Sequence, residues 1–151
     1  MRTVDRAAVA APLDRVFAVA SDVERWPAIL PHYRWVRVLE RRDDLAIVEM
    51  AAWRPFGLFN YPTWWVSEMR TEPDTRTVRY RHIRGITRGM EVEWVIRGRD
   101  DAADVTIVHE WAGPAWPAIR RPVAEWVIGP VFVHGIASRT LLGVKRAAEG
   151  T

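Results

Sequence analysis

The chain has 151 residues, of which 49% are apolar and 27% charged, which is the size and composition of one globular domain. It contains no cysteine, and this excludes disulfide scaffolds, thiolate metal sites and cysteine nucleophiles. The net charge of +3 is spread along the chain, whereas nucleic-acid-binding proteins concentrate their basic residues on one face. We therefore expect a single domain over residues 1–151, with no nucleic-acid partner.

No apolar run approaches the roughly 18 residues of a membrane-spanning helix, so we expect no transmembrane segment. Charged residues within positions 1–6 break the apolar core that a signal peptide needs, which predicts a cytoplasmic protein. The nine tryptophans are the most unusual feature of the composition. Side chains with so much apolar area must lie in a core, a cavity or an interface.

The first part of the chain predicts one strand and two short helices. Residues 3–10 are β-prone, and Pro12 then opens a helix over residues 13–20, where apolar residues recur at helical spacing. Ser21 and Asp22 supply an N-cap for a second short helix over residues 23–29, and Pro31 closes it.

From residue 33 the apolar pattern changes to a period of two, which predicts six consecutive strands. Turn-forming residues separate them, including a loop over residues 55–57 and the segment from Gly85 to Gly89. The strands are expected at residues 33–40, 45–53, 61–71, 77–83, 90–97 and 105–111.

The last segment is helical, with Pro130 as a first-turn residue. One apolar stripe follows the helix through Val133, Ile136, Ala137, Thr140, Leu141 and Val144. This order of elements predicts an α+β fold, in which a curved antiparallel sheet of about seven strands wraps around a long C-terminal helix. Such an arrangement commonly leaves an internal hydrophobic cavity between the sheet and the helix.

Strand alternation indicates which side chains face inward. The inward set is apolar and aromatic with four polar members, Ser67, Tyr80, His82 and His109, and is typical of a pocket for a flat, hydrophobic, partly oxygenated molecule. The strands at 33–40 and 45–53 carry apolar residues on both faces, so their orientation stays open. The alternative is that all these side chains fill an ordinary core. The inward set also includes Trp65, Met69, Val78, Met90, Val92, Trp94, Ile96, Val105, Ile107 and Trp111.

Five short stretches are shared, in the same order, with a known family: residues 22–27 (DVERWP), 65–68 (WVSE), 74–78 (DTRTV), 89–94 (GMEVEW) and 132–136 (FVHGI). On these stretches the chain resembles the polyketide cyclase/dehydrase (aromatase/cyclase-like) family. This family is a branch of the START-like, helix-grip (SRPBCC) superfamily, and the resemblance covers essentially the whole chain.

The resemblance implies a cofactor-independent polyketide cyclase or aromatase that promotes aldol cyclisation and dehydration of a poly-β-ketone, with an acyl carrier protein as one route of delivery. It matches Tyr33 and Trp26 to residues at the entrance of the cavity. It also implies an inward arginine where this chain has Met69, a second where it has His82, and a glutamine where it has His109.

We therefore assign proton roles to His82, His109 and Tyr33, because a neutral imidazole can donate or accept a proton. The predicted substrate-binding walls are Trp26, Trp65, Ser67, Met69, Tyr80, Met90, Trp94 and Trp111. No metal is expected, because the four histidines lack metal-ligand spacing.

Two other functions stay open at this level. One is a non-catalytic carrier or chaperone for a quinone, isoprenoid or lipid, and the absence of the expected inward arginine favours this function. The other is an interaction module with a solid core and exposed tryptophans. The sequence does not decide whether the chain is a monomer or a homodimer, or whether it is an enzyme.

Overall fold

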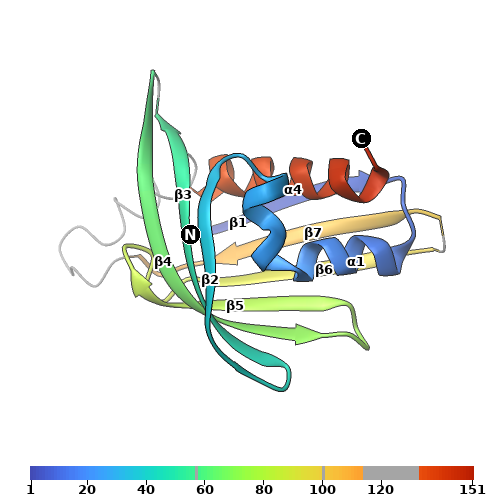
Figure 1. Ribbon diagram of the computed structural model, residues 1–151, viewed down its shortest axis with the longest axis horizontal. Helices are drawn as coiled ribbons and strands as arrows, with labels where there is room; N and C mark the ends of the chain where they lie inside the picture. The colour runs from blue at the N-terminus through green and yellow to red at the C-terminus, as the bar shows by residue number, and fades with distance from the viewer. Residues whose placement is uncertain (57, 100, 114–132) are drawn as a thin grey trace.

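A computed structural model describes residues 1–56, 58–99, 101–113 and 133–151 (Figure 1). The predicted helix start at Pro130 lies outside these residues. In chain order the elements are β1 (Arg2–Val9), α1 (Leu13–Ser21), the 3₁₀ turn η1 (Val23–Arg25), α2 (Trp26–Ile29), β2 (Tyr33–Arg42), β3 (Leu45–Phe56), β4 (Phe59–Glu72), β5 (Thr77–Gly85), β6 (Glu91–Gly98), β7 (Ala103–Glu110) and α4 (His134–Glu149).

The strands form one antiparallel sheet in the order β1-β7-β6-β5-β4-β3-β2. Figure 1 shows α1 and α4 on one face of the sheet, with β3 and β4 running across the direction of β6 and β7. The sheet therefore bends around the helices. This arrangement confirms the predicted α+β fold with seven strands and a long C-terminal helix.

Burial follows the predicted alternation on the central strands. In β6, Val92, Trp94 and Ile96 are buried, while Glu91 and Arg97 on the opposite face are exposed. The inward sides of β5 and β7 follow the same pattern, with buried residues at every second position from Val78 to His82 and from Ala103 to His109. One face of the sheet thus forms the core together with the helices.

The C-terminal helix contributes its predicted stripe to this core. Ala137, Leu141 and Val144 are buried on α4. The helix ends at Gly150, whose φ of 76° is the left-handed conformation that favours glycine at this position.

Two local predictions were wrong. The second short helix begins as the 3₁₀ turn η1, and neither Ser21 nor Asp22 caps it through a side chain: Ser21 ends α1, and its hydroxyl donates to the carbonyl of Phe17 at 2.8 Å. The expected loop at 55–57 belongs largely to the sheet, since the β3–β4 register continues through Pro55↔Asn60. The last pair of this register is Phe56↔Phe59, so both strands run further than their apolar alternation indicates.

Candidate functional site: a cavity between the sheet and the C-terminal helix

A cavity of about 70 Å³ lies between the inner face of the sheet, the short helix α2 and the start of α4. Its wall is mostly aromatic and aliphatic, with a few polar side chains. The cavity is small beside the roughly 300–1,000 Å³ of pockets for drug-sized ligands. The lining residues are Trp26, Tyr33, Met50, Trp65, Tyr80, His82, Thr87, Met90, Val92, Trp94, Ile107, His109, Val133, Ile136, Ala137 and Thr140.

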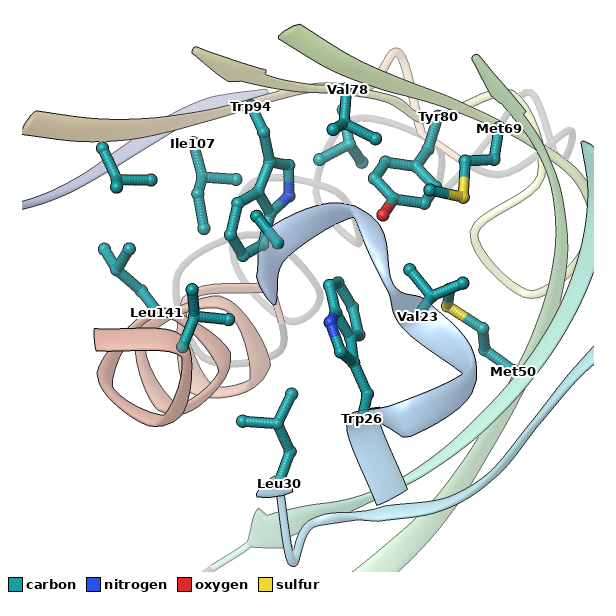
Figure 2. Close-up of a cluster of buried hydrophobic side chains, with 14 of the residues drawn as sticks. Val23, Trp26, Leu30, Met50, Met69, Val78, Tyr80, Trp94, Ile107 and Leu141 are labelled. Atoms are coloured by element: carbon teal, nitrogen blue, oxygen red, sulfur yellow. The ribbon is translucent and has the colours of Figure 1, made fainter. Parts of the chain in front are cut away.

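Five aromatic rings in mutual contact form the wall. Trp26 lies 5.7 Å from Trp94 and 5.3 Å from Tyr33, measured between ring centroids. Tyr33 in turn makes an edge contact with Trp65 at 6.2 Å, and Trp65 stacks on the imidazole of His82 at 5.8 Å with 11° between the planes. In Figure 2 the indole of Trp26 stands between Trp94 and Met50, which come from two parts of the curved sheet. These contacts fix flat faces around the cavity.

His82 reaches this wall from β5 and is held by the turn that follows. Its Nδ1 lies 2.7 Å from the hydroxyl of Thr87, and both side chains are buried. Burial, reinforced by repulsion from His109, lowers the pKa of His82 to about 3. The imidazole is therefore neutral at physiological pH, with its other ring nitrogen left for further interactions.

Several buried polar atoms on the inner face have no hydrogen-bond partner among the described residues. They include the hydroxyl oxygens of Ser67 and Tyr80, the Nδ1 atom of His109 and, on β1, Thr3 Oγ1 and Asp5 Oδ2. Burial lowers the pKa of His109 to about 4, so this imidazole is neutral as well. Leaving a buried polar group unpaired destabilises a fold by about 1–3 kcal/mol, so a set of them on one face requires an explanation.

The two inward tyrosines are phenols rather than phenolates at physiological pH. Burial raises the pKa of Tyr33 to about 12, although a hydrogen bond with Thr140 acts in the opposite direction. Burial and the proximity of Tyr33 raise the pKa of Tyr80 well above its usual value. Both hydroxyls can therefore donate hydrogen bonds to an oxygen atom within the cavity.

Eight of the predicted site residues line the cavity together, and three do not. Ser67, Met69 and Trp111 are buried on the same side of the sheet but are not part of its wall. Ser67 lies opposite His82 in the β4–β5 register, and Met69 lies opposite Tyr80. The indole of Trp111 donates to the carbonyl of Arg88 at 3.0 Å, which ties the end of β7 to the β5–β6 turn. The residues that line the cavity are Trp26, Tyr33, Trp65, Tyr80, His82, Met90, Trp94 and His109.

Two lining threonines were missed by the sequence reasoning. Thr87 sits in a turn, where strand alternation gives no orientation, yet it holds His82. Thr140 is part of the apolar stripe of α4, and its hydroxyl lies 2.9 Å from Nε2 of the buried His32. A polar residue within an otherwise apolar helical stripe is the only signal that could have marked Thr140.

No arginine is among the described residues that line the cavity. Met69 is buried at the position where the resemblance implies an inward arginine. Arg70 points outward, as alternation predicts, and pairs with Asp44 at 3.1 Å. The polar side chains of the described cavity wall are therefore hydroxyls and neutral imidazoles, with no fixed charge among them.

Within the described parts of the chain, no group of three histidine, cysteine, aspartate or glutamate side chains is placed to hold a metal ion. In those same parts, no helix has the length and apolar character needed to cross a membrane.

Comparison with known proteins places these features in a family. Residues 9–131 match the family described as "Polyketide cyclase / dehydrase and lipid transport". The chain belongs to this family. A protein named as a candidate polyketide cyclase of Streptomyces halstedii is 32% identical over 100 residues, which cover 62% of this chain and 84% of that protein. The bifunctional cyclase/dehydratase of the actinorhodin polyketide synthase of Streptomyces coelicolor is 28% identical over 124 residues, covering 79% of this chain and 38% of that longer protein.

Solved structures show the same fold. The Zhui aromatase/cyclase from Streptomyces sp. R1128 superposes with a TM-score of 0.73 at 22% identity, over 97% of this chain and 95% of that chain. A START superfamily protein from Mycobacterium smegmatis superposes with a TM-score of 0.66 at 16% identity, over 99% of this chain and 97% of that chain. The predicted family and its START-like, helix-grip fold are thus confirmed.

Proposed function

We propose that the protein is a cyclase of the aromatase/cyclase type, which binds a poly-β-ketone in the cavity and promotes its aldol cyclisation and dehydration. The observation that carries this proposal is the pair of unpartnered buried polar atoms on Tyr80 and His109, which both line the cavity. They project from two strands, β5 and β7, into a cavity whose wall is mostly apolar. A hydrophobic molecule with several carbonyl oxygens satisfies such groups while its carbon atoms pack on the aromatic wall.

The ring-closing step needs a proton to leave one carbon and a proton to reach one oxygen. A base takes a proton from a methylene group between two ketones, and the resulting enolate carbon attacks a distant ketone carbon. The new alkoxide oxygen takes up a proton. Loss of a second α-proton and of that hydroxyl group as water then forms the double bond, so no oxidant or reductant is consumed.

We assign the donor role to the phenols. Tyr33 and Tyr80 are neutral at physiological pH and can donate hydrogen bonds to a ketone oxygen, which stabilises the enolate and the alkoxide. Because the described cavity wall carries no fixed positive charge, neutral donors must supply this stabilisation. A neutral imidazole can also donate a hydrogen bond to a ketone oxygen. We assign this additional donor role to His82, whose ring is held by Thr87.

We assign the proton-shuttling role to His109. Its neutral imidazole has an unpartnered Nδ1 that can accept a proton from carbon. Its low pKa makes the imidazolium short-lived, so the proton passes on readily to the alkoxide. The aromatic wall contributes orientation, because holding the two reacting carbons of one chain in a single fold lowers the entropic cost of ring closure.

A poly-β-ketone needs more room than about 70 Å³, so binding has to displace lining side chains. Met50 and Met90 are suited to this, since both line the cavity and methionine adopts many rotamers at low cost. We therefore expect substrate binding to be accompanied by repacking of these two residues.

The test is the product profile of a poly-β-ketone-forming synthase with and without the protein. We expect the wild type to shift the profile towards one cyclised aromatic product. Tyr80→Phe and His109→Gln should each lower that product about 10²-fold or more, in line with the loss of a positioned donor or proton carrier. Tyr61→Phe removes a hydroxyl from an exposed tyrosine and serves as the matched control.

An unchanged profile with the wild-type protein would refute the enzymatic proposal. Native mass spectrometry of freshly purified protein then distinguishes the remaining functions. A retained hydrophobic ligand indicates a carrier, and an empty protein that also fails to take up aromatic polyketides indicates that the cavity binds no ligand.

A further inference from the structure

The tip of the β3–β4 hairpin exposes large apolar side chains. Leu58 is 99% exposed, Phe59 75% and Tyr61 61%, and these three residues are called the hairpin tip below. Figure 1 shows this hairpin projecting well beyond the helices that cover the sheet. Because exposed side chains of this size contribute nothing to the core, the hairpin tip points to an interaction outside the molecule.

Below the hairpin tip, the outer face of the sheet carries three tryptophans, each covered by an arginine, and this is called the Trp–Arg face. The guanidinium carbons lie 4.4–5.6 Å from the ring centroids, within the range of cation–π contacts. Trp53 and Trp64 are still more than one-third exposed. The pairs are Arg34 with Trp53, Arg37 with Trp35, and Arg84 with Trp64.

Arginines outnumber acidic residues at this end of the molecule, where Glu49 pairs with Arg37 at 3.6 Å and accepts a hydrogen bond from the indole of Trp64 at 3.2 Å. Between Glu49 and Glu68 the sequence contains one charged residue, Arg54. The end of β5 and the β5–β6 connection, together residues 81–90, contain three arginines and no acidic residue, although Arg81 lies opposite Glu68 and Glu91 on the neighbouring strands. This segment lies beside the Trp–Arg face, since Arg84 covers Trp64 across the strand boundary. Excess positive charge therefore surrounds the base of an apolar projection.

We propose that this end of the protein binds an anionic lipid surface, with the hairpin tip inserted among the acyl chains. The order of side chains along the hairpin supports this occupant. Leucine and phenylalanine come first, tryptophan and tyrosine follow at the depth where membrane proteins carry their aromatic belts, and arginines follow at the depth of the phosphate groups.

An acidic protein partner fits the observations less well. The arginines could pair with its carboxylates, but such a contact gives no role to Leu58 and Phe59 at the far end of a projecting hairpin. A lipid surface uses both features together. It also places the cavity beside the bilayer, because Thr87, a lining residue, belongs to the β5–β6 connection that borders the Trp–Arg face.

The absence of cysteine allows a site-specific test. Leu58→Cys and Leu39→Cys each introduce one exposed thiol, at the hairpin tip and on β2 respectively, for labelling with an environment-sensitive fluorophore. We expect a blue shift at position 58 on adding vesicles of phosphatidylglycerol and phosphatidylcholine, little shift at position 39, and a weaker response with phosphatidylcholine alone or at high salt.

A second measurement uses co-sedimentation of unlabelled protein with the same vesicles. Burying a leucine or phenylalanine contributes about ten- to a hundredfold to binding, so Leu58→Asp/Phe59→Asp should lower the bound fraction by at least that factor. Leu39→Asp is the control, and both side chains changed in the double variant are exposed, so the fold should be retained.

Absence of binding by the wild type, or equal shifts at positions 58 and 39, would overturn the proposal. A shift at position 58 caused by an acidic acyl carrier protein but not by vesicles would also overturn it, in favour of a protein partner.

Discussion

Acid should destabilise this protein more than its carboxylates alone would, because His82 and His109 are buried in their neutral forms. Their pKa values are about 3 and about 4 in the folded chain, against about 6.5 for an unfolded histidine. At pH values between the folded and the unfolded pKa, the unfolded chain therefore binds more protons than the folded chain. The free energy of unfolding thus decreases as the pH falls below about 6.5. From pH 7.5 to pH 5.0 each histidine removes about 2 kcal/mol, or about 4 kcal/mol for the pair.

The assay is urea unfolding, followed by far-UV circular dichroism, at a series of pH values for the wild type and for His109→Gln. The variant lacks one of the buried histidines whose pKa is lowered, while His32, with a pKa of about 4, is common to both proteins. The variant's loss of stability between pH 7.5 and pH 5.0 should therefore be smaller than that of the wild type by about 2 kcal/mol. The comparison cancels the carboxylates, which both proteins share. Equal pH dependence in the two proteins would refute the assignment of His109 as a neutral, buried imidazole.

Four further variants probe the packing in and around the site. Gly143→Ala places a methyl group against the buried side chain of Leu30 and should lower the free energy of unfolding by about 1–3 kcal/mol. Gly135→Ala, in the same helix but with open space around it, should raise the free energy of unfolding by up to about 1 kcal/mol. Urea titration of both variants shows whether the two changes have opposite signs. Thr87→Val leaves the imidazole it holds unpaired and should destabilise by about 1–3 kcal/mol, with a shift of the histidine ring resonances by NMR. Met69→Arg buries a cation without a carboxylate among its cross-strand neighbours and should lower stability by about 3 kcal/mol or more; a Tm equal to that of the wild type would contradict this.

The central strands could be predicted because one of their faces meets the core and the other meets water. Trp94 and Glu93 illustrate this, since adjacent positions on β6 point to opposite sides and differ in polarity. The same rule fails for β2 and β3. Trp35 and Trp53 lie on the outer face, where stacking with arginine makes an aromatic residue compatible with exposure. Alternation of polarity is then lost although the strands are regular.

Alternation also could not tell which inward residues reach the cavity. Ser67, His82 and Trp111 all face inward, yet of these three only His82 lines it. The difference arises from the bend of the sheet and from the irregular β4–β5 register between Val66 and Ser67, which depend on the whole fold. A period-two pattern fixes the face of a residue and carries no information on its depth along that face.

The replacement of the expected arginine by Met69 has a chemical consequence that follows from the neighbours. An inward arginine brings a permanent positive charge, whereas the described cavity wall has neutral donors and acceptors. Tyr33, with a pKa of about 12, and His109, with a pKa of about 4, keep their protonation states across the physiological range. Under the proposed cyclase function, stabilisation of an enolate would then depend on the distance and direction of hydrogen bonds rather than on net charge. The contacts of Trp26, Tyr33 and Trp65 supply that precision, because rings locked against one another hold the phenol in one orientation.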